Sequence, residues 1–340
     1  MGGDQLKHYL VTGCAGFIAS KVSEMLLEAG HRVTGIDNLN DAYDPRLKQW
    51  RLARLEGRPN FRFQRVDIAD RAALAAHFAR DAAEPQPAGG PYSAVFNLAA
   101  RAGVRPSVEN PWTYYEANAA GALNLLDLCR RHGVKKFILA STSSLYGAHN
   151  PVPFAEDADT NRPLSPYAAS KKAAETLCYT YHHLHGLDVT VFRYFTVYGP
   201  AGRPDMSVFR FCRWIAESQP ITVFGDGTQQ RDFTYVDDIA RGTIAGLAPL
   251  GYEVINLGGD RPVRLDRIIH LVSEMSGREP AIEYRPAHPA DVPATWARVE
   301  KAQRLLGWRP EVGIEEGLRR CVAWYQENRE LAGSLSLGAT

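Results

Sequence analysis

Strand and helix signals alternate along the chain from residue 8 to about residue 200. Six core strands are predicted, at residues 8–11, 32–36, 61–67, 94–98, 136–141 and 188–194. The helices between and after them are predicted near residues 17–29, 45–56, 71–80, 111–131 and 166–185. This alternation is typical of a parallel sheet covered by helices on both faces. We therefore predict an α/β fold with a Rossmann-type, doubly wound parallel sheet.

After Gly199-Pro200 the pattern changes to shorter elements. Strands are predicted at residues 221–224, 253–257 and 281–285, and helices at 206–217, 236–246, 265–276, 299–306 and 314–327. These indicate a smaller, mixed α/β lobe. We divide the chain into a dinucleotide-binding domain (1–200), a C-terminal lobe (201–330) and a flexible tail (331–340). A ligand is expected between the lobes, above the carboxyl ends of the strands.

Bulk composition narrows the class of protein. The 340 residues are 45% hydrophobic and 23% charged, which is ordinary for a globular protein with a proper core. The net charge of +1 argues against a nucleic-acid partner. No apolar run reaches membrane-spanning length, and Met1 starts too close to the first strand for a signal peptide. We expect a soluble protein without a membrane partner.

The cysteines and clustered histidines give no sign of a metal centre. The cysteines lack paired or metal-type spacing, which suits a reducing cytoplasm. They are Cys14, Cys129, Cys178, Cys212 and Cys321. No carboxylates are spaced to help His182, His183 and His185 bind a metal, and a solvated helix end explains them better. We expect a cytoplasmic protein without a metal.

A glycine loop, Thr12-Gly13-Cys14-Ala15-Gly16-Phe17-Ile18-Ala19, follows the first predicted strand. Gly13 permits a tight turn, and Gly16 lets the backbone approach a pyrophosphate at a helix N-terminus. The next strand ends at Asp37, twenty-one residues beyond Gly16. A carboxylate there is expected to bind the adenosine ribose and to repel a 2′-phosphate. The loop and Asp37 together predict NAD as the cofactor, in preference to NADP.

A second pattern supplies groups that can move a proton off an alcohol. Tyr167 and Lys171 are four residues apart in a predicted helix, so their side chains share one face. The pKa of a free tyrosine is about 10. Lowering it to about 7 needs about 4 kcal/mol of stabilisation of the phenolate, which a lysine and a positively charged nicotinamide supply together. An isolated pair of this kind is usually a surface tyrosine and a helix lysine. The glycine loop and the hydroxyls of residues 141–144 favour a hydride-transfer site instead.

Four further segments carry a resemblance to a known family. They are GIDNLNDAYD (35–44), NLAARAGVR (97–105), RYFTVYGPAGRPDM (193–206) and RDFTYVDD (231–238). In this order, and with the two patterns above, they resemble the nucleotide-sugar branch of the extended short-chain dehydrogenase/reductase family over essentially the whole chain.

The resemblance assigns roles to individual residues. It implies that Tyr167 is the base, that Lys171 lowers its pKa and holds the nicotinamide ribose, and that Thr142 orients the sugar 4-hydroxyl. It also implies a set of residues that contact NAD. That set is Gly13, Ala15, Gly16, Phe17, Ile18, Asp37, Asn38, Asn40, Asp67, Ile68, Leu98, Ala99, Ala100, Asn118, Tyr167, Lys171 and Tyr194.

For the substrate, the resemblance implies that Arg203, Arg231 and Asp291 bind the diphosphate and ribose of UDP. The lobe of residues 201–330 would then be mainly a UDP-sugar-binding lobe.

The two residues after Thr142 bear on the reaction. Relatives that dehydrate a sugar carry Asp-Glu there, and those that decarboxylate UDP-glucuronate resemble Thr-Ser-Glu at the three positions. This chain has Ser143-Ser144 and so lacks the carboxylate that those reactions use. With Thr196, these hydroxyls look like donors to a sugar carboxylate. Arg105 is a second candidate for that role, and a loop arginine that faces phosphate or solvent is its alternative.

The resemblance therefore implies NAD-dependent epimerisation at C4 of UDP-glucuronate, giving UDP-galacturonate through a 4-keto intermediate. One alternative is C4 epimerisation of UDP-glucose with relaxed selectivity at C6. Another, from a different class, is an NAD-binding regulatory module without catalysis, against which the intact Thr142, Tyr167 and Lys171 argue. A homodimer through helices 111–131 and 166–185 is also implied.

Overall fold

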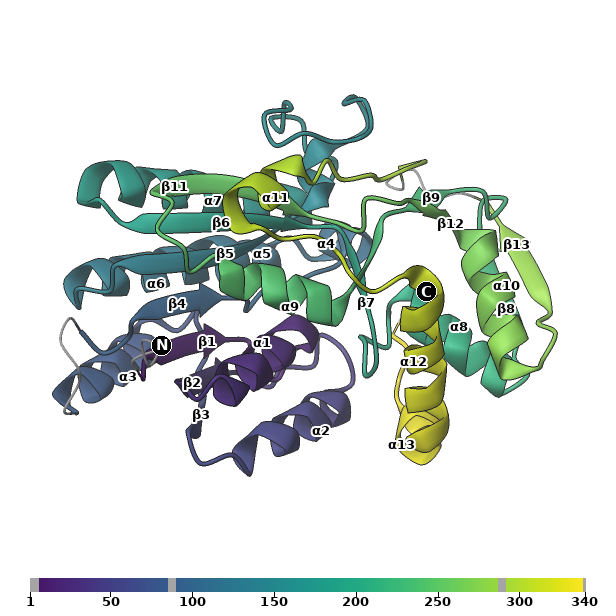
Figure 1. The fold of residues 1–340 in the computed structure, drawn as a ribbon, viewed down its shortest axis with the longest axis horizontal. Helices are drawn as coiled ribbons and strands as arrows, with labels where there is room; N and C mark the ends of the chain where they lie inside the picture. Colours follow the sequence, from purple (N-terminus) through teal and green to yellow (C-terminus); the bar gives the residue numbers. More distant parts are fainter. Residues whose placement is uncertain (1–5, 85–89, 287–291, 339–340) are drawn as a thin grey trace.

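A single parallel sheet of seven strands organises the molecule (Figure 1). The computed structural model describes residues 6–84, 90–286 and 292–338. The strand order is β11-β6-β5-β4-β1-β2-β3, and every neighbouring pair is parallel. The strands are β1 (His8–Thr12), β2 (Arg32–Asp37), β3 (Phe61–Arg65), β4 (Ala94–Asn97), β5 (Lys136–Thr142), β6 (Asp188–Tyr194) and β11 (Tyr252–Leu257). The predicted doubly wound fold is confirmed.

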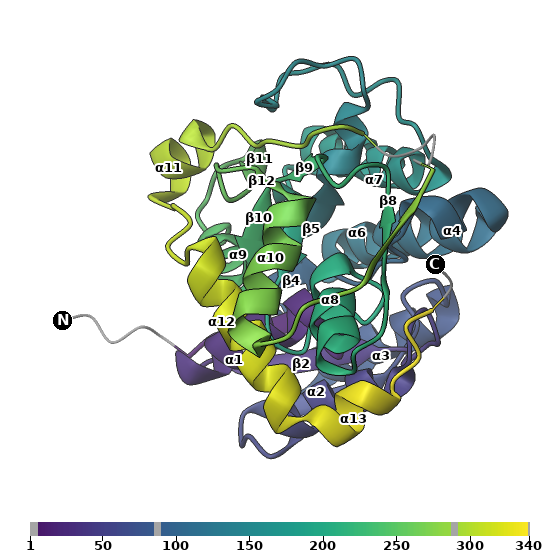
Figure 2. The same cartoon turned by 90° about the vertical axis from the view of Figure 1, so that its right-hand side faces the viewer.

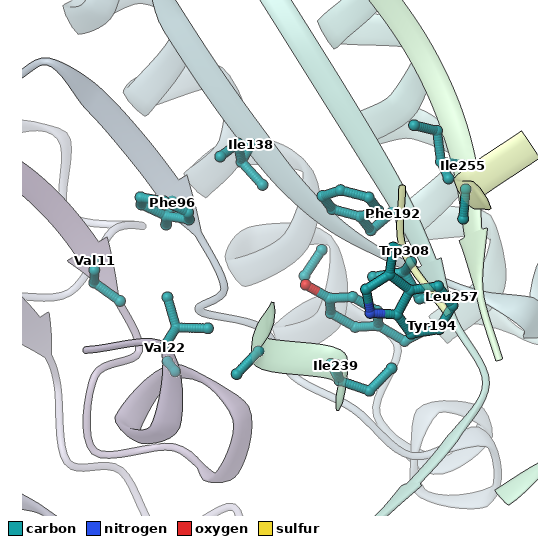
Figure 3. Packing of buried hydrophobic residues seen from close by; sticks show 14 of the residues in the cluster. Val11, Val22, Phe96, Ile138, Phe192, Tyr194, Ile239, Ile255, Leu257 and Trp308 are labelled. Atoms are coloured by element: carbon teal, nitrogen blue, oxygen red, sulfur yellow. The ribbon is translucent and has the colours of Figure 1, made fainter. Parts of the chain in front are cut away.

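Helices cover both faces of this sheet. On one face lie α1 (Phe17–Glu28), α2 (Pro45–Glu56), α9 (Val236–Ala245) and α11 (Glu300–Leu306). On the other lie α3 (Arg71–Ala83), α6 (Gly121–Arg131) and α7 (Pro166–His185). Successive strand residues point to opposite faces. Thus Phe96 and Ile138 pack towards α1 and α9 (Figure 3), whereas Val95 and Phe137 belong to the core beneath α6 and α7.

Helix α7 is delimited by signals in its own sequence. Ser165 is the N-cap, and its hydroxyl accepts a hydrogen bond from the backbone N–H of Ala168. Pro166 occupies the first helical position, where its missing N–H costs nothing. Gly186 ends the helix in the left-handed conformation, at φ 65°. These signals place Tyr167 in the first turn of α7, at the carboxyl-end edge of the sheet.

Most of the remaining elements form a second, smaller lobe (Figure 2). Its core is separate from that of the sheet and includes Phe209, Ile268 and Leu318. The elements are β7 (Thr196–Tyr198), α8 (Ser207–Ala216), β8 (Ile221–Phe224), β9 (Gln230–Arg231), β10 (Phe233–Tyr235), β12 (Val263–Arg264), α10 (Leu265–Ser276), β13 (Ile282–Arg285), α12 (Ile314–Glu327) and α13 (Arg329–Ser334). The strands of this lobe pair in three two-stranded sheets: β7 with β10, β9 with β12 and β8 with β13.

The expected division at residue 200 is too simple. Strand β11, which we assigned to the C-terminal lobe, pairs along its whole length with β6 and forms the edge of the main sheet. Helix α9 packs against α1, and Ile239 and Trp308 join the core of the first domain (Figure 3). The chain returns to the main sheet with β11 because β6 carries apolar residues on both faces and needs a neighbouring strand on its open side.

The expected flexible tail is also wrong over the part that the structure describes. Residues 329–334 form helix α13, and Leu335 is buried in the core of the second lobe. Arg210 donates to the carbonyl oxygen of Leu337 at 2.9 Å, and Asp44 accepts from the backbone N–H of Ser336 at 2.9 Å. The tail therefore bridges the lobe and the N-terminal end of α2.

The predicted helix at 111–131 is not one regular helix. It consists of α5 (Trp112–Tyr114), a π-helical segment η1 (Tyr115–Ala120) and α6. The short elements α4 (Val104–Glu109) and the 3₁₀ turn η2 (Ser143–Tyr146) were not predicted, and neither were β7, β9, β10, β12 and α13. No helix in the described part of the chain is both long enough and apolar enough to cross a membrane.

Candidate active site

A cleft opens where strands β1 to β6 end, at the edge that faces the second lobe. Ligands of doubly wound proteins bind at this edge. Most of the predicted cofactor and catalytic residues line it. They are Gly13, Gly16, Phe17, Ile18, Asp37, Asn38, Asn40, Asp67, Ile68, Leu98, Ala99, Ala100, Thr142, Tyr167, Lys171 and Tyr194. Arg203, from the second lobe, lines it as well.

The glycine loop has the shape of a diphosphate cradle. Gly13 has φ 70°, and a Cβ atom there would lie 2.8 Å from the Cα of Ala99, so a side chain is excluded. Gly16 is the N-cap of α1 and has no side chain to cap the free N–H groups of the first turn. Uncapped N–H groups at a helix N-terminus bind anionic phosphates. The described residues therefore fit a dinucleotide.

Asp37 lies at the end of β2, beside the loop. Its carboxylate accepts from the backbone N–H of Ala15 at 3.2 Å and from that of Leu39 at 2.7 Å. Ala15 itself is fully buried and acts through this contact. Asn38 donates to the carboxylate of Asp67 at 2.7 Å, which ties the ends of β2 and β3 together. This geometry presents an acidic wall to the adenosine side of a bound dinucleotide.

Sequence reasoning missed a cationic wall in the same cleft. The ammonium of Lys48 lies 3.8 Å from the Asp37 carboxylate and donates to Asn40 at 2.9 Å. Burial lowers the pKa of Lys48, and the charge of Asp37 opposes that shift. Three cations lie over the Tyr43 ring. The Lys48 ammonium is 5.2 Å from the ring centroid, and the guanidinium carbons of Arg51 and Arg203 are 5.5 and 5.6 Å from it. Tyr43 falls in a segment that carried the resemblance, which is the signal that marked this region.

The groups proposed for proton transfer meet at the end of β5. Burial raises the pKa of the Tyr167 phenol, while its hydrogen bond with the Thr142 hydroxyl and the charge of Arg203 act in the opposite direction. Burial also lowers the pKa of Lys171 to about 8. The ammonium of Lys171 donates to the carbonyl oxygen of Ala140 at 2.9 Å. Burial therefore favours the protonated form of Tyr167, whereas the Thr142 hydroxyl and the Arg203 charge favour the phenolate.

A buried ion pair supports this part of α7. The guanidinium of Arg193, on β6, donates to both carboxylate oxygens of Glu175, at 3.0 and 2.9 Å. Ser141 donates to the same carboxylate at 2.6 Å. Glu175 follows Lys171 by one helical turn, and its charge raises the pKa of Lys171 against the effect of burial. The pair joins β5, β6 and α7 directly beneath the catalytic residues.

Asn118 does not line the cleft among the described residues. It lies in η1, and its amide bonds the backbone N–H and carbonyl oxygen of Arg101 at 2.9 and 3.0 Å. It also donates to the Ser170 hydroxyl at 2.9 Å. Asn118 thus fastens the loop after β4 to α7, and a direct contact with the cofactor stays a prediction.

Several predicted substrate residues lie outside the cleft wall in the described part of the chain. Ser143 and Ser144 form the 3₁₀ turn beside it, and Thr142 donates to the Ser144 hydroxyl at 3.2 Å. Thr196 begins β7, where its N–H bonds the carbonyl oxygen of Asp232. Arg105 stacks on the Phe224 ring at 4.2 Å.

Arg231 lies in β9, is not among the described residues that line the cleft, and donates to the carbonyl oxygen of Gln230 at 2.8 Å. Asp291 falls outside the described residues. The assignment of Arg231, Asp291 and the residues above to the substrate stays a prediction.

Taken together, the cleft is that of a Rossmann-type NAD enzyme with a tyrosine–lysine pair. The chain belongs to the NAD dependent epimerase/dehydratase family, whose model matches residues 9–258. It is 56% identical to the UDP-glucuronate 4-epimerase of Thermodesulfobacterium geofontis, over 97% of this chain and 99% of that protein.

Solved structures agree with the sequence comparison. The UDP-glucuronic acid 4-epimerase of Bacillus cereus, in complex with UDP-glucuronic acid and NAD, superposes with a TM-score of 0.86 at 36% identity. The match covers 94% of this chain and 99% of that one. The UDP-glucose 4-epimerase of Thermotoga maritima, with UDP-glucose, gives a TM-score of 0.85 at 33% identity, over 95% of this chain and 99% of that one.

Proposed function

We propose that the protein is an NAD-dependent UDP-glucuronate 4-epimerase that produces UDP-galacturonate. The observation that carries this is the meeting of Tyr167, Lys171 and Thr142 in one cleft with the glycine loop, next to a pair of serines that supplies no further acid or base. The similarity to enzymes of that name over nearly the full chain supports it.

The residues of the cleft divide the chemistry between them. When bound, NAD supplies the reversible oxidation and reduction of C4. Tyr167 takes the proton of the 4-hydroxyl and returns it after the 4-keto sugar has turned its other face to the cofactor. Thr142 orients that hydroxyl through its hydrogen bond with Tyr167. The ammonium of Lys171 stabilises the phenolate, and the Lys171 pKa of about 8 keeps it charged at neutral pH.

Substrate selection is proposed to depend on the carboxylate of the sugar. The half-buried Ser143, Ser144 and Thr196 stand next to the cleft, where each hydroxyl can donate to a carboxylate at C5. A hydrogen bond to a charged group contributes about 1.5–3 kcal/mol, so two of them give a preference well above tenfold in kcat/KM for UDP-glucuronate over UDP-glucose.

The test is to incubate the purified protein with UDP-glucuronate, without added cofactor, and to identify the products by NMR. We expect UDP-galacturonate, and we expect NAD to copurify because the cycle ends with oxidised cofactor. UDP-glucose is assayed in parallel. Equal kcat/KM for the two sugars favours a UDP-glucose 4-epimerase, and turnover only with a stoichiometric external reductant identifies a ketoreductase.

We also propose a homodimer through helices 111–131 and 166–185. Trp112 has an exposed fraction of 76%, and the large apolar side chains of Tyr115, Leu123 and Tyr179 are exposed on the same helices. Such exposed apolar surface marks protein interfaces. Sedimentation equilibrium should give a dimer that Leu123→Glu dissociates, whereas Ile282→Glu, on the exposed strand β13, should leave it intact.

A cytoplasmic location fits the five cysteines, all of which are buried free thiols.

A further inference from the structure

Arg51 is a buried arginine of α2 that contacts both sides of the cleft. Its Nη1 donates to the carbonyl oxygen of Ala15, in the glycine loop, at 3.2 Å. The same nitrogen donates to the Tyr43 hydroxyl at 2.7 Å. Nε and Nη2 both donate to the carbonyl oxygen of Ala201, at 3.1 and 2.7 Å. One side chain therefore joins the cofactor loop, the cleft wall and the segment that leads to Arg203.

The charge of Arg51 has an unusual environment. Its exposed fraction is 3%, and the described residues place no carboxylate within ion-pair distance of it. Its partners are two carbonyl oxygens, one phenol and the faces of the Phe17 and Tyr43 rings, at 5.8 and 5.5 Å from the guanidinium carbon. A buried cation is costly unless its donors are satisfied, and only a planar guanidinium can reach all of these acceptors at once.

The main acceptor of Arg51 has a strained backbone. Ala201 has φ 51°, a left-handed conformation that a residue with a Cβ atom rarely adopts. Two residues later the chain reaches Arg203, which lines the cleft and donates to the carbonyl oxygen of Ala102 at 3.3 Å. If Ala201 relaxed to an ordinary conformation, the direction of the chain into Arg203 would change.

We propose that Arg51 is a positioning residue that holds Ala201 in this conformation and so keeps Arg203 directed into the cleft. Because the same guanidinium bonds the glycine loop, it also couples the UDP side of the site to the cofactor side. A ligand that orders one end of this link lowers the cost of ordering the other, and the coupling is reciprocal. The inference rests on the proposed function for the identity of the sugar, but not for the binding of UDP or NAD.

The first test removes the donors of Arg51 in the holoenzyme. We expect Arg51→Met to weaken UDP binding, measured by calorimetry, by at least about tenfold, and to raise KM for UDP-glucuronate by a similar factor. We expect kcat to change by less than about threefold, because the proton-transfer groups are not touched. Arg51→Lys keeps the charge but not the fork of donors, and it should lose nearly as much affinity.

Arg54 provides the matched control. It lies one turn further along α2, but its side chain is 58% exposed and its guanidinium lies over the ring of Trp50. Arg54→Met removes the same charge from the same helix, and UDP affinity should stay within twofold of the parent. A loss equal to that of Arg51→Met would mean that net charge, not the contact with Ala201, decides binding.

The second test asks whether UDP affinity is recovered when the strain at Ala201 is relieved. Glycine adopts the left-handed conformation without steric cost, so Ala201→Gly in the Arg51→Met background should recover about threefold to tenfold in UDP affinity. In the parent background, Ala201→Gly should change affinity by less than about twofold, since Arg51 already holds the conformation. If Arg51→Met does not fold, the same rescue is measured in Arg51→Lys.

The coupling between the UDP side and the cofactor side of the site is measured by the retention of NAD. UDP should slow the loss of NAD from the parent holoenzyme on dilution, and it should slow that loss less in the Arg51 variants. UDP affinity within twofold of the parent in both Arg51 variants, or an affinity loss that Ala201→Gly does not relieve, overturns the proposal. A parent enzyme that binds UDP but does not epimerise UDP-glucuronate contradicts the proposed function instead, and leaves the Arg51 measurements interpretable.

Discussion

The buried pair Glu175–Arg193 offers the sharpest test of how the fold supports the catalytic residues. Each side chain of the pair is only 4% exposed, and both carboxylate oxygens accept from the guanidinium. Glu175→Gln keeps the shape but leaves the charge of Arg193 buried without its counter-ion. Breaking a buried pair in this way costs about 3–5 kcal/mol of unfolding free energy.

The surroundings place the expected loss at the lower end of that range. Arg193 keeps two other acceptors, the Tyr146 hydroxyl at 3.1 Å and the carbonyl oxygen of Glu156 at 3.0 Å. A glutamine at position 175 can still accept from the Ser141 hydroxyl. We therefore expect a loss of about 3 kcal/mol, measured by urea unfolding of the holoenzyme.

The control is a partly exposed acidic residue, Asp127, on the other helix of this face. Asp127 pairs with Arg130 and Arg131 at 2.8 and 2.6 Å, but both arginines are half exposed. Asp127→Asn should cost less than about 1 kcal/mol. A double variant, Glu175→Leu with Arg193→Met, removes both charges and should be more stable than Glu175→Gln.

The same substitution has a catalytic readout. The charge of Glu175 raises the pKa of Lys171, which burial holds at about 8. Without that charge the pKa of Lys171 falls, so the ammonium is lost at a lower pH as the pH rises. The fall of kcat/KM at high pH should therefore begin at a lower pH in Glu175→Gln than in the parent. A stability loss below about 1 kcal/mol together with no shift of that fall would refute the reasoning.

Three further outcomes are expected. Tyr167→Phe should retain UDP binding but lose about 10²–10⁴-fold in turnover, and a variant within a few-fold of the parent would require another base. Thr196→Ala or Ser143→Ala should free the sugar carboxylate and raise the ratio of released CO₂ to epimerised product; an unchanged ratio would mean that these hydroxyls bind substrate without guarding it. Burial lowers the pKa of His77 to about 4, so the unfolded chain takes up a proton first, and stability should fall by up to about 3 kcal/mol between pH 6.5 and 4; His77→Gln should flatten that slope.

Features that depend on residues close to one another in the sequence were predictable from it. The first six strands appear at the predicted positions, within a few residues at their ends. Tyr167 and Lys171 share a helix face because both lie in one helix whose cap and stop signals are local. Asp37 meets the glycine loop because both follow adjacent strands at the same edge of the sheet.

Other features depended on segments that meet only in the folded chain. Strand β11 joins the main sheet because the exposed edge of β6 accepts it, and no local signal distinguishes that edge from a partner in the second lobe. The C-terminal tail packs against the second lobe because the apolar Leu335 is buried in the core that α8 and α12 form.

The cationic wall of the cleft shows the same division most clearly. Lys48 and Arg51 are polar positions of α2, and helical periodicity places such residues towards solvent. Arg51 is buried because Ala201, 150 residues further along the chain, lies across from it and supplies its acceptor. Local sequence determined which groups α2 carries, while the packing of the second lobe against it decided which of them enter the site, since burial is a property of the whole fold.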